Sequence, residues 1–338
     1  MRRIILGIVL MLALPVKADF TEGVSYFDNQ QYTQAFAEFK PLADKDDERA
    51  QYYTAYLYLN GYGVAQDTKQ GLAYLQKSVD QGYDKAMTLM GYLYSEGKYL
   101  PKDKAKALEL YKAAAEMDDD DALLNLGVMY YTGDSVEKDV EKAIEYFSRV
   151  DLVNKPIVGR YLGDIYQYSK DAAERKKARE LYTLAASNGD LGSYNALAYM
   201  AQMGREDARD LDKAILYYTY AASQSYAPAQ YALGTIYANG ENIQRDIIKA
   251  YAWLSLAANQ GLNVAVQAQK QLESNMTLTE LDLARREVIE LQQNVIGQVE
   301  SPLKDFALKN KNIGPQEMEH KKRPRSRRRA RTKVNQKE

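Results

Sequence analysis

The sequence predicts an all-α fold: a solenoid of about seven two-helix repeats, followed by a C-terminal capping helix and a disordered basic tail. Three observations predict this class. Small residues recur with a period of about 36 residues, apolar residues within a period are spaced as on one helix face, and glycine and aspartate stand where helices should end and begin.

The period is carried by two independent series of residues. The first series is the alanine of Lys-Ala-like segments, and the second marks the start of each unit. Both series have intervals of 36, 36, 36, 35, 36 and 36 residues. Both series have their single 35-residue interval at the same place, which indicates that they mark the same stacked supersecondary units. The first series is Ala35, Gly71, Ala107, Ala143, Ala178, Ala214 and Ala250, and the second is Ala50, Ala86, Ala122, Val158, Ser193, Ala229 and Ala265.

Each unit has the pattern of two helices. In the unit that begins at Ala122, apolar residues Ala122, Leu126 and Tyr130 share one helix face because they are spaced four residues apart. Gly133 follows as a left-handed C-cap, and Asp139 then caps the N–H groups of a second helix. The pattern predicts a helix, a short loop and a second helix in each unit.

One small residue in each first helix has a packing reason. With no side chain or a single methyl group, it lets the neighbouring helix approach closely, and a leucine there would overpack the contact by roughly 1–3 kcal/mol. These residues are Gly91, Gly127, Gly163, Ala198 and Gly234.

The combined pattern resembles the Sel-like repeat (SLR) family, a relative of the tetratricopeptide repeat. The best match is the unit with Ala229, Leu233-Gly234, Tyr237, Gly240, Asp246, Lys249-Ala250, Trp253, Ala257-Ala258 and Gly261. The resemblance covers about residues 20–293. It implies a right-handed superhelix with a concave and a convex face, and it says almost nothing about the ligand.

The ends of the repeat region depart from this pattern. Gly23, Tyr26 and Ala35 have the tighter spacing of a tetratricopeptide repeat, and the unit at Val158 lacks the loop glycine. After Gly261 the second half of a seventh unit is replaced by a helix near residues 279–293, which resembles the family's closing helix. We therefore expect repeats with their cap over residues 19–293 and a disordered basic tail over 294–338.

Residues 1–18 have the pattern of a secretory signal peptide. Two arginines precede an apolar run from Ile4 to Leu14, and Val16-Lys17-Ala18 fits a cleavage site. The alternative is a membrane anchor, but eleven residues rise only about 16 Å as a helix, roughly half a bilayer core. No cysteine follows the run, which excludes a lipoprotein signal. We expect a soluble mature chain starting near Asp19 and located in a bacterial periplasm or secreted.

The composition argues against most catalytic chemistry. The chain has no cysteine and one histidine, His320, in the polar tail. Thiol nucleophiles, Cys-based zinc sites and multi-His metal sites are therefore excluded, and no folded element near His320 could orient it for a triad. We expect no enzyme, cofactor or metal. A carboxylate-only enzyme, as in glycoside cleavage, is the remaining alternative, although no carboxylate pair stands out.

Two local motifs have both a binding and a structural interpretation. Gly61–Gly63 resembles part of a phosphate loop, but it lacks a preceding strand and further glycine spacing, so we expect a turn between helices. Asp118–Asp121 could bind calcium, but it lacks alternating ligand positions and a later bidentate acid. We expect instead a solvated helix N-terminus favoured by the helix dipole.

Tyrosine is abundant, with 29 residues against 6 phenylalanines. One repeat position should be packed between helices: Tyr58, Tyr94, Tyr130, Tyr166 and Tyr237. By analogy with tetratricopeptide repeats, other first-helix positions should line the concave face, where Tyr and Arg commonly anchor partners. The structural alternative for each is a half-exposed side chain without a partner. The concave-face set is Tyr52, Tyr56, Tyr92, Tyr131, Arg160, Tyr168, Tyr199 and Tyr231.

The C-terminal residues differ in charge from the rest. Residues 19–301 carry 29 basic and 42 acidic residues, whereas residues 302–338 carry 13 and 4. Few apolar groups and three prolines predict disorder there. Anionic membrane, an acidic envelope protein or polymer, and nucleic acid are the competing ligands, and a solubilising tail that touches its own acidic body is the structural alternative. The basic cluster is Lys321, Lys322, Arg323, Arg325, Arg327, Arg328, Arg329, Arg331 and Lys333.

The sequence thus favours a non-enzymatic scaffold or adaptor in the cell envelope. It would bind a protein partner on the concave face and use the basic tail at anionic surfaces. The alternative is a protein that binds an anionic polymer or nucleic acid mainly through the tail, with the repeats as a spacer. The tail segment from Lys321 onward has no aromatic residue, so it cannot stack on bases, and nucleic acid is the less favoured ligand.

Overall fold

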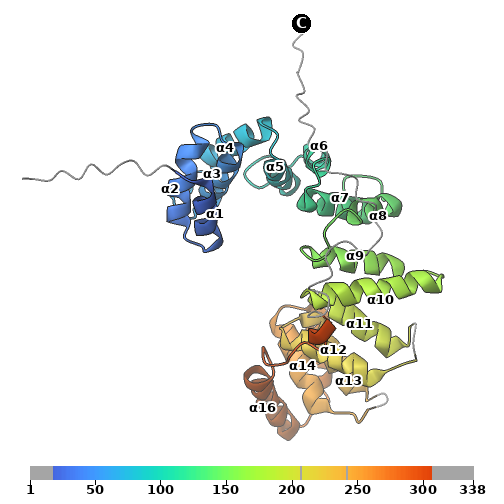
Figure 1. The fold of residues 1–338 in the computed structure, drawn as a ribbon. Helices are drawn as coiled ribbons and strands as arrows, with labels where there is room; N and C mark the ends of the chain where they lie inside the picture. The colour runs from blue at the N-terminus through green and yellow to red at the C-terminus, as the bar shows by residue number, and fades with distance from the viewer. Residues whose placement is uncertain (1–17, 206–207, 241–242, 307–338) are drawn as a thin grey trace, which may run out of the picture. The chain divides into compact units, whose positions relative to one another are not determined.

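The computed structural model describes residues 18–205, 208–240 and 243–306 (Figure 1). The signal-peptide pattern up to residue 17 and the basic cluster at 321–333 lie outside the described residues. The chain divides into two compact units, an N-terminal unit up to Ala178 and a C-terminal unit from Arg179. Each unit is described by itself.

Every regular element in the described part of the chain is an α-helix, which confirms the predicted fold class. The N-terminal unit contains α1 (Phe20–Asp28), α2 (Tyr32–Ala43), α3 (Glu48–Asn60), α4 (Thr68–Asp80), α5 (Asp84–Glu96), α6 (Lys104–Ala115), α7 (Asp120–Thr132), α8 (Val140–Phe147) and α9 (Pro156–Tyr166). Helix α10 (Ala172–Ser187) spans the boundary. The C-terminal unit contains α11 (Leu191–Met203), α12 (Leu211–Ser223), α13 (Ala227–Asn239), α14 (Ile247–Asn259), α15 (Asn263–Glu273) and α16 (Leu278–Asn294).

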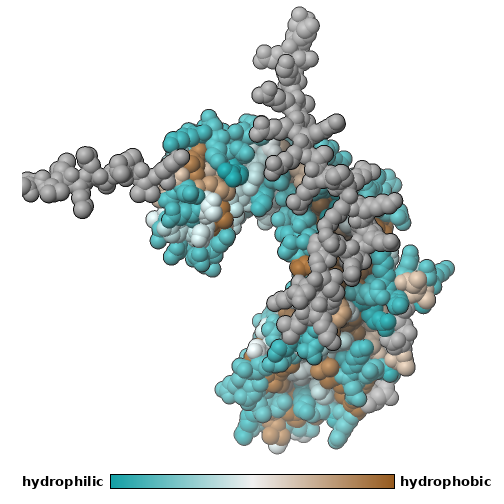
Figure 2. All heavy atoms as spheres, in the orientation of Figure 1, coloured by the Kyte–Doolittle hydropathy of each residue, from teal (hydrophilic) through white to brown (hydrophobic). Residues whose placement is uncertain are grey.

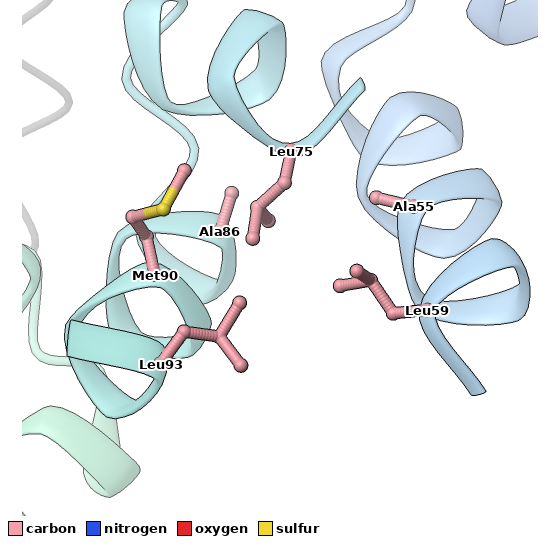
Figure 3. Packing of buried hydrophobic residues seen from close by; sticks show 6 residues of the cluster. All are labelled: Ala55, Leu59, Leu75, Ala86, Met90 and Leu93. Atoms are coloured by element: carbon pink, nitrogen blue, oxygen red, sulfur yellow. The ribbon is translucent and has the colours of Figure 1, made fainter. Parts of the chain in front are cut away.

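Helices pack in the order of a solenoid. The closest partners are the two helices of one repeat, such as α3 with α4 and α13 with α14. Second helices also pack against the first helix of the next repeat, as α4 does against α5 and α12 against α13. Figure 3 shows one such interface, in which Ala55, Leu59, Leu75, Ala86 and Met90 meet from α3, α4 and α5. The core of each unit is thus a chain of neighbour interfaces.

The predicted cap residues end the first helix of a repeat and begin the second. Gly133 ends α7 with a φ of 76°, a left-handed conformation that costs glycine little. The side chain of Asp139 accepts a hydrogen bond from the Lys142 backbone N–H at the start of α8. The same pair recurs around other repeats, with glycine at 61, 97, 204 and 240 and aspartate at 67, 103, 210 and 246.

The small residues in the first helices lie where the second helix crosses. A Cβ atom on Gly91 would come within 2.9 Å of the Tyr111 ring, and one on Gly127 would overlap the ring of Phe147. Real Cβ contacts are not this short, so these positions need glycine, as predicted.

The repeat series stops at α15 for a visible reason. Lys270 stands 36 residues after Gly234, where earlier repeats have a small residue, so a second helix could not approach α15 in the usual way. The chain instead forms α16, which packs against α14. Thr277 and Glu280 form a reciprocal capping box at its start.

The chain after α16 returns to earlier helices. The Gly297 N–H donates to the Ser223 carbonyl at 2.7 Å, Tyr194 and Ser301 share a hydrogen bond of 2.5 Å between their hydroxyls, and Leu303 is buried. We call residues 297–303 the return segment. It falls within residues 294–338, for which the sequence predicts disorder, and Leu303 adds a buried apolar side chain there.

Within the described residues, no helix is both long enough and apolar enough to cross a membrane.

Candidate functional site

The abundant tyrosines fall into two classes. In one class, the ring lies three residues after the small residue of a first helix and is covered by a lysine ammonium from the second helix. This lysine immediately precedes the alanine of the repeat, so the pairing accounts for the Lys-Ala motif. The pairs are Tyr94 with Lys106 (5.2 Å to the ring centroid), Tyr130 with Lys142 (5.3 Å), Tyr166 with Lys177 (4.4 Å) and Tyr237 with Lys249 (5.7 Å).

The lysines are fixed from the other side by the helix caps. Lys142 forms an ion pair of 3.0 Å with Asp139, and equivalent pairs of 3.8 Å join Lys106 to Asp103 and Lys249 to Asp246. The backbone N–H of Lys142, followed by its side chain, lowers the pKa of Asp139. These tyrosines therefore stabilise the repeat.

The second class comprises the tyrosines predicted to contact a partner. Successive first helices carry the eight predicted residues, with one exception discussed below. In each unit separately, we call the exposed side of these first helices the first-helix face. Tyr52 and Tyr56 lie on α3, Tyr92 on α5, Tyr131 on α7, Arg160 on α9, Tyr199 on α11 and Tyr231 on α13.

Tyr168 is the exception, because α9 ends before reaching it. The C-cap residue Gln167 has right-handed backbone angles, whereas α3, α5, α7, α11 and α13 end on a left-handed glycine. The missing loop glycine of this repeat therefore changes how its first helix ends. Tyr168 follows in the turn and is 67% exposed.

Tyr52 is presented less openly than the sequence suggested. Its ring makes edge-on contacts with Tyr53 and Tyr83, with centroid distances of 5.2 and 5.6 Å. Burial raises the pKa of Tyr52. Tyr52 contributes to packing between neighbouring repeats.

Tyr56 belongs to an aromatic cluster that sequence reasoning missed. Its ring lies 5.6 Å from Phe27 and 6.2 Å from Tyr62, and Tyr62 stacks on Tyr32 at 4.9 Å. Tyr62 is 41% exposed. The signal that could have revealed it is Gly61–Gly63, a tight turn that leaves its central tyrosine at the surface.

Tyr92 is the most open tyrosine within a described first helix, with 46% of its surface exposed. Glu96 follows one helical turn later on the same face of α5 and is exposed. The ring of Tyr111 crosses Gly91 from α6. Burial raises the pKa of Tyr111, and the charges of Glu96 and Tyr92 raise it further.

Tyr131 and Arg160 lie on successive first helices and already have intrachain partners. Tyr131 contacts Tyr161 edge-on at 6.0 Å, and the Lys138 ammonium lies 5.7 Å from its ring centroid. Arg160 is 3.9 Å from Asp164. This part of the first-helix face is therefore more structural than the part around Tyr92.

In the C-terminal unit, Tyr199 and Tyr231 line one pocket of about 210 Å³ between α11 and α13. The pocket lining combines apolar side chains with amide and hydroxyl groups. Asn195, one turn before Tyr199 and outside the lining, has a buried Oδ1 with no hydrogen-bond partner among the described residues. The remaining lining residues are Gln202, Met203, Arg209, Leu211, Ala232, Thr235, Ile236 and Asn239.

The acidic run Asp118–Asp121 is divided among separate partners. Asp119 accepts hydrogen bonds from the Ala122 N–H at 2.8 Å and from the Thr88 hydroxyl at 2.7 Å. Asp118 pairs with Arg149 at 2.7 Å, and Asp121 pairs with Lys155 at 2.5 Å. The carboxylates serve as a helix cap and as links between repeats. Among the described residues, no three or more metal-binding side chains converge.

Gly61–Gly63 forms the turn expected from its context. Gly61 is the left-handed C-cap of α3, and a Cβ on Gly63 would overlap the Tyr32 backbone. The Thr33 hydroxyl reaches the Gly63 carbonyl at 3.5 Å. The loop is filled by α2, which leaves no cradle for a phosphate.

Comparisons with known proteins identify the repeat. The Sel1 repeat model matches residues 48–83, 84–119, 120–149, 160–190, 192–226 and 227–262. No curated protein sequence matches the chain.

Two solved structures share the fold. A protective antigen of uropathogenic Escherichia coli strains that displays an SLR fold is 25% identical, with a TM-score of 0.74. The match covers 88% of this chain and 63% of that one, so this chain spans less than two thirds of the antigen's length. A Sel1 repeat protein from Oxalobacter formigenes is 26% identical, with a TM-score of 0.64, and the match covers 72% of this chain and 100% of that one. The family model matches six repeats, most of these repeats have the same helix caps, and close contacts at glycine recur among them. The chain belongs to the Sel1 repeat family.

Proposed function

We propose that this chain is a non-enzymatic scaffold of the bacterial envelope or exterior that binds a protein partner on its first-helix face. Sel1 repeats mediate protein–protein interactions. One observation carries the assignment to this face: Tyr92 is open to solvent, whereas Tyr94, two residues later, is covered by Lys106. Exposed tyrosines bury a large area on binding at little cost in side-chain entropy.

The test is site-specific photo-crosslinking in living cells followed by mass spectrometry. A photoreactive residue would replace Tyr92 or Tyr231 on the first-helix face. The control position is Leu216, which is 51% exposed on second helix α12. We expect one protein to crosslink from both first-helix positions and not from 216. Crosslinking of the same protein with equal yield from 216 would refute the assignment to this face.

We further propose that the signal-peptide pattern directs the chain to the periplasm or outside the cell. The support is the apolar run Ile4–Leu14 with its flanking charges and cleavage site. The measurement is the mass of the protein recovered from a periplasmic fraction. We expect a chain that begins near Asp19, and recovery of the uncleaved chain in the cytoplasm would overturn this part.

The basic cluster supports a second binding activity, toward anionic surfaces. Each Lys or Arg near an anionic membrane contributes about 1 kcal/mol, so nine of them could hold the chain at low salt. The test compares the full chain with a chain ending at Phe306, using vesicles that contain phosphatidylserine. We expect salt-sensitive binding by the full chain alone. Equal binding by both chains would remove the proposal.

The same cluster favours the alternative function, binding of an anionic polymer or nucleic acid through the tail. Its nine cations would release counterions from any polyanion. Adding polyphosphate and single-stranded DNA to the vesicle experiment separates the two. Tighter binding to a polymer than to vesicles, with no crosslinked protein at Tyr92, would favour the alternative.

A further inference from the structure

The surface around Tyr92 combines an exposed aromatic ring with a carboxylate, and these groups indicate which side chain of a partner it would bind. This step rests on the proposed function of the first-helix face. It concerns two exposed side chains of α5, the ring of Tyr92 and the carboxylate of Glu96, which we call the Tyr92 cluster.

Two features of the backbone build the cluster. Tyr92 and Glu96 are four residues apart on α5, so both side chains leave the helix on one side. Gly91 allows the Tyr111 ring to cross α5, since any Cβ at that position would meet the ring at 2.9 Å. An exposed carboxylate and an open aromatic ring therefore lie one helical turn apart on α5, and the buried ring of Tyr111 packs at the adjacent Gly91.

The carboxylate has no cation of its own among the described residues. Neither Glu96 nor Tyr92 takes part in an ion pair or a cation–π contact there. Lys98, two residues after Glu96, lies over the ring of Tyr99 at 5.0 Å. In contrast, Tyr94 and Tyr131 each have a lysine ammonium over the ring. The Tyr92 cluster has the groups that elsewhere in this chain receive a cation, and here the cation is absent.

The charge of the surrounding unit points the same way. Residues 19–178 contain 28 acidic and 20 basic residues, so the N-terminal unit has an excess of eight negative charges. A basic partner segment would be attracted to this unit over a distance of about a Debye length, roughly 8–10 Å at ordinary ionic strength.

We infer that the Tyr92 cluster binds an arginine side chain carried by an extended segment of the protein partner. A guanidinium is planar, so it can stack on the Tyr92 ring while its N–H groups face the Glu96 carboxylate. Lysine offers a point charge without this planar match and should bind more weakly.

The test is fluorescence anisotropy with three labelled peptides and the full chain. Each peptide repeats Gly-Ser-X four times, where X is arginine, lysine or citrulline, the neutral isostere of arginine. We expect arginine to bind more tightly than lysine, and citrulline to bind at least about tenfold more weakly than arginine, as loss of a charge-assisted contact predicts. Equal binding of the arginine and citrulline peptides would overturn the inference.

Variants locate the binding on the surface. Tyr92→Ala and Glu96→Gln should each weaken the arginine peptide about three- to fivefold, whereas Tyr92→Phe retains the ring and should change affinity less than about twofold. Glu109→Gln, which removes an exposed charge from α6, is the matched control and should have no effect. If Glu109→Gln weakens binding of the arginine peptide as much as Glu96→Gln does, binding depends only on the overall negative charge of the unit. That result would contradict a specific site at Tyr92 and Glu96.

Failure here is distinguishable from failure of the proposed function. If crosslinking at residue 92 still recovers a partner while the arginine and citrulline peptides bind equally, the first-helix face stands and its preference for arginine is wrong. If position 92 crosslinks no more than position 216, the proposed function itself is wrong.

Discussion

The N-terminal and C-terminal units contain the same repeat, but only the C-terminal unit has described segments outside the repeats, α16 and the return segment, packed on its repeat helices. In the C-terminal unit, α16 covers α14, and the return segment is anchored to Ser223 and Tyr194. The described residues of the N-terminal unit have no comparable returning segment, and their contacts join neighbouring repeats. The exposed aromatic and acidic groups around Tyr92 lie in this simpler unit. The comparison teaches that helices beyond the repeats can stabilise one part of a solenoid while the repeat surface elsewhere stays open.

Neither unit presents a continuous apolar face in the view of Figure 2. Figure 2 shows mainly hydrophilic residues, with separate hydrophobic patches instead of one continuous apolar face. Scattered apolar residues are normal for a folded surface. Recognition by either unit should therefore depend on particular side chains, such as Tyr92 in one unit and Tyr231 in the other.

The largest expected effect comes from adding one carbon to a repeat glycine in each unit. Gly127→Ala would push a methyl group into the ring of Phe147, whereas Gly234→Ala meets Cγ of the Leu254 side chain at 2.6 Å and the Ala250 carbonyl oxygen at 3.1 Å. We expect Gly127→Ala to lower the free energy of unfolding by about 1–3 kcal/mol and Gly234→Ala by less. Urea denaturation measures both. The reverse order would mean that the rigidity of the opposing side chain does not control the cost.

A smaller effect should come from the return segment. Leu303→Ala removes a buried apolar contact and should destabilise the C-terminal unit by about 2 kcal/mol. Tyr194→Phe removes the hydrogen bond to Ser301 and should cost about 1 kcal/mol. Hydrogen exchange resolves the location: protection should fall in α11 and α12 and remain in α3 to α6. Equal loss in both units would show that the return segment does not act locally.

The smallest effect should come from a surface network of the N-terminal unit. Lys40 pairs with Asp44 at 2.6 Å, and the Tyr74 hydroxyl donates to the same carboxylate. Lys40 and then Tyr74 lower the pKa of Asp44, and the hydrogen bond to Asp44 raises the pKa of Lys40 to about 12. Because the groups are largely exposed, Asp44→Asn should lower the melting temperature by about 1 °C or less.

The pH dependence of this difference has a definite sign. The folded pKa of Asp44 lies below its ordinary 3.8, so its stabilisation is present above that pH and is lost as pH falls through the folded value. The raised pKa of Lys40 makes the contribution disappear as pH rises through about 12. Melting curves at pH 7 and pH 2.5 check the acid side. A wild-type advantage that grows toward pH 2.5 would contradict the pairing.

The fold could be predicted from the sequence because each repeat contains residues that mark its helix ends and its close helix contact. The interval series located the units, Gly133 and Asp139 located the helix ends, and Gly127 located a close contact. The end of the series was also readable in principle, since Lys270 occupies the place of a small residue.

The candidate site was harder to read because a repeat position does not fix exposure. Tyr56 and Tyr92 occupy the same repeat position, 36 residues apart, yet Tyr56 packs against Phe27 and Tyr62, whereas Tyr92 is exposed. Tyr168 was assigned to a helix that ends before it. The cluster of Tyr92 with Glu96 required knowing that Tyr111 crosses Gly91, which is a tertiary contact.

The most direct test of the central claim compares two tyrosines two residues apart. Tyr92→Ala and Tyr94→Ala remove the same group from α5, one from the open face and one from beneath Lys106. The measurement is the yield of the crosslinked partner from Tyr231 in cells that contain each variant at equal amount. The account predicts a clear loss for Tyr92→Ala and a near wild-type yield for Tyr94→Ala. Equal yields for both variants, or loss for Tyr94→Ala alone, would contradict it.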